Sequence, residues 1–312
     1  IIDELSSRAT QWRDVPMLSR THGQPATPTT FGKELAVFAH RLKRVVQPLR
    51  SLSLPAKING ATGTFSAHQV AWPSTDWPAL SRGFIERLGL EWNPLTTQIE
   101  SHDGLVSLFH QMSHVGTIAH NLCTDVWTYI SLGYLRQIPV KGATGSSTMP
   151  HKVNPIRFEN AEANLEIANG LLGTLASTLG TSRLQRDLTD SSTQRNIGVA
   201  MGHQMVAWSN IQKGLGQVDV APEVMAADLD ATHEVLAEAI QTVIRAEIVA
   251  GNSSISDPYD VVKQLTRGEQ VTAETLTEFV NTLDVSDEAK ARLLALTPAT
   301  YIGLANKLVD EL

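Results

Sequence analysis

Residues 104–135 read GLVSLFHQMSHVGTIAHNLCTDVWTYISLGYL, and they indicate the class of fold more strongly than any other part of the chain. Their apolar residues recur at steps of three and four, the spacing that places side chains on one face of an α-helix. One continuous helix here would extend about 45 Å at ~1.5 Å per residue, far beyond the usual globular helix of ~11–12 residues. Residues 30–50, 159–179 and 192–215 have the same pattern. Such long helices bury their apolar faces along one another, so the sequence predicts an all-α protein with a long-helix bundle.

The pattern changes after residue 215. Shorter helical stretches follow, and they are broken at residues 251–258 (GNSSISDP) and 284–287 (DVSD). We therefore expect a central long-helix bundle domain over residues 1–215 and a small helical C-terminal domain over residues 216–312. The chain begins with Ile1, inside a stretch that itself has a helical pattern, so we expect it to start within an element.

The composition excludes several classes of protein. Of the 312 residues, 42% are hydrophobic and 18% are charged, which is ordinary for a globular protein. The formal net charge of −7 disfavours nonspecific binding to nucleic acid or to an anionic membrane surface. Cys123 is the only cysteine. A disulfide framework is therefore excluded, and the reducing cytoplasm is the expected location.

The strongest local signal for chemistry is the segment GSSTMPHKVNP at residues 145–155, within a loop expected over residues 141–155. It brings the hydroxyls of Ser146 and Ser147 close in sequence to the cation of Lys152. A serine hydroxyl beside a cation and amide donors suits a nucleophile or a general base. The alternative is an ordinary surface loop, because Ser, Gly and Pro are common at turns.

A second segment, SRTHGQPATP at residues 19–28, places His22 in a turn that we expect between two helices. An imidazole can titrate near neutrality and transfer protons. The alternative is a histidine that caps a helix or hydrogen-bonds within the core.

A third segment contains Arg186, Ser191 and Arg195. In one continuous helix, at about 100° per residue, the two arginines would lie on nearly opposite faces. They can therefore meet at one anion only if the segment bends or enters from a loop. Two guanidinium groups and a hydroxyl suit a phosphate. The alternative is a set of exposed ion pairs with Asp187 and Asp190.

Two further patterns lead to no functional prediction. Residues 60–63 (GATG) lack the spacing of a dinucleotide-binding loop. His110 and His114 are spaced as two zinc ligands on a helix could be, but no glutamate directly follows His110. We expect no metal and no cofactor.

Taken together and in order, these segments resemble the fumarase/aspartase superfamily, whose signature loop is similar to residues 145–155. The variant with His151 in that loop resembles the adenylosuccinate lyase branch, in the form of bacterial purine biosynthesis. The similarity extends through essentially the whole chain. The segments that carry it are residues 19–28, 96–103 (TTQIESHD), 145–155, 185–192 (QRDLTDSS) and 296–303 (LTPATYIG).

The resemblance implies a lyase that removes fumarate by β-elimination from adenylosuccinate, giving AMP, and from SAICAR, giving AICAR. It implies that Ser146 is the general base and His22 the general acid. The substrate-binding residues that it implies are Gln98, Ser147, Lys152, Asn154, Asn160, Arg186, Ser191 and Arg195.

Each of these binding residues has an implied contact. Lys152 and Asn154 are expected to hold the succinyl carboxylates, and Gln98 the fumarate portion. Arg186, Ser191 and Arg195 are expected to bind the phosphate of the nucleotide. Ser147 and Asn160 are expected to make further substrate contacts.

The resemblance also implies a homotetramer whose active sites are shared between subunits, with a small-molecule substrate. Members of the family carry an N-terminal domain that supplies a further active-site histidine and a Thr-Ser pair. We expect this domain to be absent here, and the chain by itself to have little or no activity.

Two other functions remain open. A different lyase of the superfamily, such as an argininosuccinate lyase or a fumarase, would act on substrates without a phosphate. His151 in the signature loop and the predicted phosphate site of Arg186, Ser191 and Arg195 disfavour such a lyase. A catalytically silent helical assembly module would keep His22 and Ser146 far apart in the assembled oligomer.

Overall fold

The computed structural model describes residues 1–139, 149, 152–265 and 271–312. Internal contacts divide the chain into two compact units. The first unit consists of Ile1, Arg41–Tyr129 and Gln137–Val218, and the second of Ile2–His40, Ile130–Arg136 and Asp219–Leu312. The domain boundary expected at residue 216 remains a prediction.

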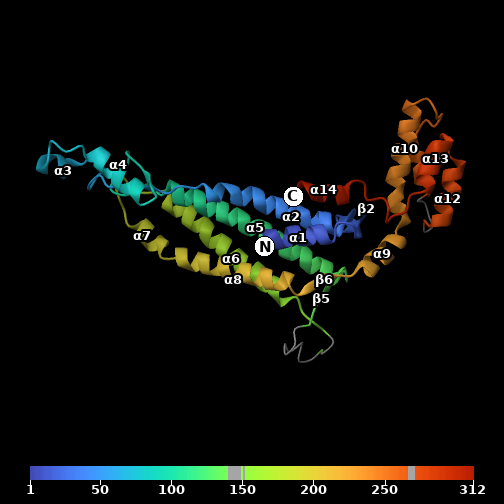
Figure 1. Cartoon of the computed structure of the whole chain (residues 1–312), viewed down its shortest axis with the longest axis horizontal. Helices are drawn as coiled ribbons and strands as arrows, with labels where there is room; N and C mark the ends of the chain where they lie inside the picture. Colours follow the sequence, from blue (N-terminus) through green and yellow to red (C-terminus); the bar gives the residue numbers. More distant parts are fainter. Residues whose placement is uncertain (140–148, 150–151, 266–270) are drawn as a thin grey trace. The chain divides into compact units, whose positions relative to one another are not determined.

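The long helices expected from the sequence are present (Figure 1). They are α2 (Phe31–Arg50), α5 (Asp103–Ser131), α6 (Ile156–Leu179) and α8 (Ile197–Leu215). α5 ends before the predicted residue 135, because Gly133 adopts a φ of 75° that favours a residue without a Cβ. The helix expected over residues 192–215 is two helices, since α7 (Thr189–Gln194) ends before α8 begins. The prediction of an all-α fold with a long-helix bundle is thus confirmed.

Side chains from α5, α6 and α8 form the apolar core of the first unit. Phe109 on α5 and Leu172 on α6 are fully buried, and Ala200 on α8 packs against them. α6 and α8 lie side by side along their length (Figure 1). The contact is close at Gly116 on α5, where an added Cβ would stand 2.5 Å from Oδ1 of Asn169. Burial of such large apolar side chains stabilises the bundle by roughly 1.5–3 kcal/mol each.

The rest of the first unit contains two shorter helices and a small parallel sheet. These elements are α3 (Ser66–Ala71), α4 (Trp77–Arg87), β3 (Pro55–Ala56) and β4 (Glu91–Trp92). Asn59 is completely buried, and its Nδ2 donates a 2.8 Å hydrogen bond to Oγ1 of Thr96. Gly63 has a φ of 82°, and an added Cβ there would stand 2.0 Å from the carbonyl oxygen of Thr96. The loop after β3 is therefore packed tightly against residues 96–98.

The second unit joins the N-terminal segment to the C-terminal helices. Its N-terminal elements are α1 (Ile2–Gln11) and the antiparallel hairpin of β1 (Pro16–Thr21) and β2 (Gln24–Thr30). Its C-terminal helices are α9 (Pro222–Asp230), η1 (His233–Leu236), α10 (Ala237–Val249), α11 (Pro258–Leu265), α12 (Ala273–Thr282), α13 (Asp287–Leu294), α14 (Ala305–Leu308) and η2 (Val309–Glu311). A further two-stranded sheet pairs β5 (Leu135–Gln137) with β6 (Val218–Val220).

The predicted breaks in the C-terminal part are confirmed. α10 ends at Val249 and α11 begins at Pro258, while α12 ends at Thr282 and α13 begins at Asp287. α12 begins with a capping box in which Thr272 and Thr275 satisfy each other's backbone N–H groups. The core between these helices is made of branched aliphatic side chains such as Ile240, Ile244 and Val280. Among the described residues, no helix is both long and apolar enough to cross a membrane.

Candidate active site

His22 lies at the tip of the β1–β2 hairpin, and its side chain is exposed. The sequence led us to expect a turn between two helices, and the hairpin differs from that expectation. The segment is rich in threonine and proline, residue types that disfavour a helix interior. His22 has a φ of 53° and Gly23 a φ of 74°, so both central residues of the turn are left-handed. This is the backbone of a type I′ hairpin turn.

The signature loop is described only in part. Ser146, Ser147 and His151 lie outside the described residues. Lys152 is exposed, and its backbone N–H donates a 3.1 Å hydrogen bond to the carbonyl oxygen of Met149. Asn154 is half-buried and lies two residues before the start of α6.

Asn160 is on the first turns of α6 and belongs to a network of amides. Its Oδ1 accepts hydrogen bonds from Nδ2 of Asn210 on α8, at 2.8 Å, and from Nδ2 of Asn164, at 3.2 Å. The oxygen of Asn210 in turn accepts a 3.0 Å bond from Arg157. The side chain of Asn160 is thereby held at the same end of α6 as Lys152 and Asn154.

Gln98 is positioned by two loops of the first unit. Its backbone N–H donates a 3.2 Å hydrogen bond to the carbonyl oxygen of Gln185, the residue before Arg186. Its own carbonyl oxygen accepts a 2.6 Å bond from Nζ of Lys57. The same ammonium also donates to the carbonyl oxygens of Gly60 and Thr97, at 2.9 and 3.1 Å. Desolvation by burial lowers the pKa of Lys57 from its ordinary value.

Arg186 is in the loop before α7, and Arg195 follows the end of that helix. The segment therefore breaks between the two arginines, as a shared anion site would require. Nη2 of Arg186 stands 3.7 Å from Oδ1 of Asp190, a side chain that is 7% exposed. Oδ2 of Asp190 contacts Nε2 of His102 at 3.3 Å. Of the ion pairs that we named as the alternative, the pair of Arg186 with Asp190 is present, although Asp190 is buried rather than exposed. A phosphate would compete with Asp190 for Arg186.

The candidate residues of the first unit form two separate groups. Lys152, Asn154 and Asn160 are at the start of α6, while Gln98 and Arg186 are beyond its end. α6 has 24 residues, which corresponds to about 36 Å at ~1.5 Å per residue. A single small substrate cannot reach both groups in one copy of the chain.

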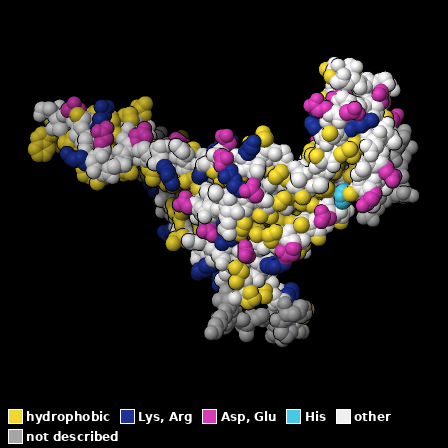
Figure 2. Space-filling model, turned by 45° about the vertical axis from the view of Figure 1, so that its right-hand side comes forward, with side chains coloured by type: hydrophobic (Ala, Val, Ile, Leu, Met, Phe, Trp, Pro, Cys, Tyr) yellow, Lys and Arg dark blue, Asp and Glu magenta, His cyan; other side chains and the backbone are white. Residues whose placement is uncertain are grey.

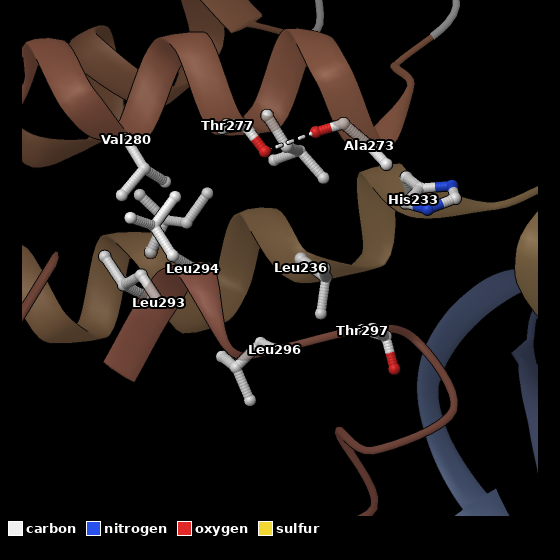
Figure 3. Close-up of a pocket in the computed structure, with 11 residues that line it drawn as sticks. His233, Leu236, Ala273, Thr277, Val280, Leu293, Leu294, Leu296 and Thr297 are labelled. Atoms are coloured by element: carbon white, nitrogen blue, oxygen red, sulfur yellow. Dashed lines mark hydrogen bonds between the residues drawn. The ribbon is translucent and has the colours of Figure 1, made fainter. Parts of the chain in front are cut away.

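Two hollows differ in how well they suit a polar substrate. An open hollow in the first unit has Lys57, Gln98, Glu100 and His102 among its lining residues. A cavity of about 140 Å³ in the second unit is lined chiefly by aliphatic side chains such as Leu236, with His233 near one end (Figure 3). The first hollow is the one of the two that includes charged side chains and a predicted site residue, Gln98.

The structure adds Lys57 and His102 to the residues that the sequence indicated, and it gives Asp190 a second partner in His102. Lys57 and Gln98 are 41 residues apart, and His102 and Asp190 are 88 apart. No spacing rule relates residues at such separations. The available signals were that His102 lies within the segment TTQIESHD and Asp190 within QRDLTDSS, two of the segments that resemble the superfamily.

Comparison with known families covers nearly the whole chain. The family described as "Lyase" matches residues 1–168, and the family described as "Adenylosuccinate lyase C-terminal" matches residues 182–302. The 3-carboxy-cis,cis-muconate lactonizing enzyme of Pseudomonas putida has a similar structure, with a TM-score of 0.76 and 25% identity over 99% of this chain and 69% of that one. A fumarate lyase from Mesorhizobium sp. BNC1 has the same fold, with a TM-score of 0.74 and 22% identity over 99% of this chain and 69% of that one. Fold and family match together define a lyase built on a long-helix bundle.

Curated relatives narrow that class. The adenylosuccinate lyase of Escherichia coli (strain K12) is 48% identical over 312 residues, which are 100% of this chain and 67% of that protein. The adenylosuccinate lyase of Dictyostelium discoideum is 45% identical over 310 residues, covering 97% of this chain and 65% of that protein. The chain belongs to the adenylosuccinate lyase family. The resemblance drawn from its sequence segments is confirmed, and an argininosuccinate lyase or fumarase is disfavoured.

Proposed function

We propose that this chain catalyses the elimination of fumarate from adenylosuccinate, giving AMP, and from SAICAR, giving AICAR. The observation that carries the proposal is the match to adenylosuccinate lyases along the whole chain, at 48% identity to the enzyme of E. coli. In this reaction a proton leaves the carbon next to a carboxylate, and the C–N bond then breaks with its electron pair going to the nitrogen. A base, an acid and stabilisation of the carboxylate charge are therefore required.

The signature loop and the hairpin would supply the proton transfers. We assign Ser146 as the base that removes the proton and His22 as the acid that protonates the departing nitrogen. The exposed position of His22 at a hairpin tip supports this role, because the imidazole is free to project into a cleft formed with another segment. Lys152 and Asn154 would hold the carboxylate where negative charge develops, and preorganised donors of this kind contribute roughly 3–4 kcal/mol each.

The phosphate of the nucleotide would bind the segment around α7. Arg186, Ser191 and Arg195 offer two guanidinium groups and a hydroxyl on a stretch that is not one continuous helix. The backbone bond from Gln98 to Gln185 supports placing the fumarate-binding residue beside this segment.

We further propose a homotetramer in which each active site is shared between subunits. The separation of the two groups of residues at opposite ends of α6 supports this, since only different copies could bring them to one substrate. Apolar side chains exposed on the bundle support association: Met205 on α8 is 73% exposed and Ile167 on α6 is 49% exposed. Figure 2 shows further hydrophobic side chains over the α3–α4 segment, where Val70 is 86% exposed.

Mixing two inactive variants tests both proposals. We expect Ser146→Ala and Arg186→Ala, made separately in the full-length enzyme, each to lose nearly all turnover of adenylosuccinate, measured by absorbance. The two variants are then mixed, dissociated into subunits and allowed to reassociate. If each site takes the signature loop from one subunit and the α7 segment from another, some sites in the mixture hold both native Ser146 and native Arg186. Activity should then reappear in the mixture but not in either variant treated alone.

Two outcomes would contradict the assignment. Full turnover by Ser146→Ala would remove its role as base, and no recovery in the mixture would argue against sites shared in this way. Arg245→Ala, which removes an exposed arginine on α10, is the charge-matched control and should keep full activity. Sedimentation velocity of the native enzyme measures the tetramer directly.

The expected location follows from the single cysteine. Cys123 is buried and is the one cysteine of the chain, which suits the cytoplasm, and we propose that location. Cell fractionation would test it.

A further inference from the structure

The hairpin that carries His22 needs support from the rest of the second unit. A two-stranded hairpin is marginally stable by itself in water. A residue other than glycine in the left-handed region costs a further ~1–2 kcal/mol, and His22 is such a residue, with a φ of 53°. The direction of its imidazole therefore depends on what holds the two strands.

The first strand is held by a carboxylate that bridges to a buried tyrosine. Nη2 of Arg20, two residues before His22, lies 2.8 Å from Oδ2 of Asp228 on α9. The hydroxyl of Tyr134 donates a 2.5 Å hydrogen bond to the same oxygen. Tyr134 is 1% exposed, so its ring is fixed by packing, whereas the Arg20–Asp228 pair is partly exposed.

The second strand is held in the same manner. The hydroxyl of Thr27 donates a hydrogen bond to Oε2 of Glu238 on α10. The hydroxyl of Tyr301 donates to that same oxygen at 3.2 Å. Each strand of the hairpin is thus tied to a tyrosine through one carboxylate oxygen.

An apolar cluster lies on the same side of the hairpin. Leu18 on β1 packs with Leu229 on α9 and Val235 on η1, and all three are buried. Because Leu229 adjoins Asp228 in sequence, the apolar contact and the first bridge act on neighbouring positions. The cluster prevents β1 from lifting away, and the two bridges oppose sliding and rotation of the strands.

We infer that Tyr134 and Tyr301, acting through Asp228 and Glu238, are positioning residues that fix the hairpin and so aim the imidazole of His22 at the substrate. This inference rests on the proposed role of His22 as general acid. An exposed ion pair such as Arg20–Asp228 contributes only ~0–1 kcal/mol, so the buried tyrosine hydroxyl supplies the rigid part of the bridge. Displacement of a catalytic group by about 1 Å lowers a rate by about 100-fold.

The test is a double-mutant cycle in the full-length enzyme. Tyr134→Phe removes one oxygen atom and keeps the ring, and we expect kcat to fall roughly 10-fold to 100-fold, with KM changed less than about 3-fold. In a His22→Ala background the same substitution should lower kcat no further, because there is no imidazole left to misplace. Tyr301→Phe should behave alike, with a smaller effect since its hydrogen bond is longer. Tyr259→Phe, which alters an exposed ring on α11, is the control and should leave kcat unchanged.

The outcomes separate this inference from the role of His22. If His22→Ala keeps native turnover, the assignment of His22 as acid fails and the inference fails with it. If His22→Ala is impaired, then an unchanged kcat for Tyr134→Phe would overturn the inference alone. An equal loss of kcat in both backgrounds would also overturn it, because a general structural role acts without regard to His22. Thermal unfolding of each variant shows whether it is folded. If Tyr134→Phe does not fold, Tyr301→Phe provides the same test at the second strand.

Discussion

The ammonium of Lys57 donates a 2.6 Å hydrogen bond to the carbonyl oxygen of Gln98, a residue 41 positions further along the chain. All three of its hydrogen bonds go to backbone carbonyls, since Gly60 and Thr97 are the other acceptors. A solvated lysine would show no such saturation. The contact joins the loop after β3 to the segment that carries a proposed substrate-binding residue.

Replacement of Lys57 should therefore loosen this junction. Lys57→Met leaves three carbonyl oxygens without their donor, and a hydrogen bond to a charged group contributes about 1.5–3 kcal/mol. We expect urea unfolding to show a loss of stability of about that size, together with a higher KM for adenylosuccinate. Lys290→Met is the matched control, because Nζ of Lys290 donates one exposed bond, to Asn281 at 3.3 Å. An equal loss in both variants would contradict the prediction.

Gly116 should tolerate no side chain. A Cβ there would stand 2.5 Å from Oδ1 of Asn169 and 3.0 Å from Nε2 of Gln204, both within the packed bundle. We expect Gly116→Ala to cost about 1–3 kcal/mol of stability through overpacking. Gly83 on α4 has nothing within 4 Å of an added Cβ, so Gly83→Ala should stabilise its helix by roughly 0.5–1 kcal/mol. Thermal unfolding of the two variants shows whether each substitution lowers or raises stability. A stabilising effect of Gly116→Ala would show that the bundle can expand at this position.

Asp187 should contribute a pH-dependent term to stability. The backbone N–H and the hydroxyl of Thr189 hold its charged form, and the pKa is lowered from 3.8 to about 2. Because the folded pKa is the lower one, the contribution is present above pH 4 and is lost as the pH falls toward 2. The difference in urea midpoint between the native protein and Asp187→Asn should therefore shrink from pH 5 to pH 3. A difference that stays constant over this range would mean that the carboxylate charge is not involved.

Cys123 should resist alkylation in the folded protein. Burial and, to a lesser degree, the nearby charge of Glu162 raise the pKa of its thiol well above the ordinary value. Since the thiolate is the reactive form, iodoacetamide at pH 8 should leave the native protein unmodified and label one site after unfolding in urea. Mass spectrometry counts the label. Rapid labelling of the native protein would show that α5 opens frequently at this position.

The sequence predicted the long helices well because their signal is local. Apolar residues at steps of three and four define each helix without reference to any partner, and glycine or proline marks several of the ends. The same reasoning did not reveal the β1–β2 hairpin. Its two strands pair across a two-residue turn, His22–Gly23. Nothing in the residue type of His22 indicates that its backbone is left-handed, so the sequence did not mark this turn as a hairpin turn.

The sequence also indicated the candidate site by its resemblance to a family, and a large part of that prediction remains a proposal. His22, Gln98 and Arg186 could be named because their neighbours in sequence form recognisable segments. Their supporting residues could not, since Lys57, Tyr134 and Asp228 act across separations at which no periodicity applies.

The amino-acid sequence thus determined the helical periodicity, the segments that mark the adenylosuccinate lyase family and the residue types able to perform an elimination. All of these depend on short-range order along the chain. Only the tertiary structure decided that Gln98 lies beside Gln185, and that two tyrosines hold the strands beside His22. Such contacts depend on how rigid helices pack against one another, and packing joins residues that are distant in the sequence.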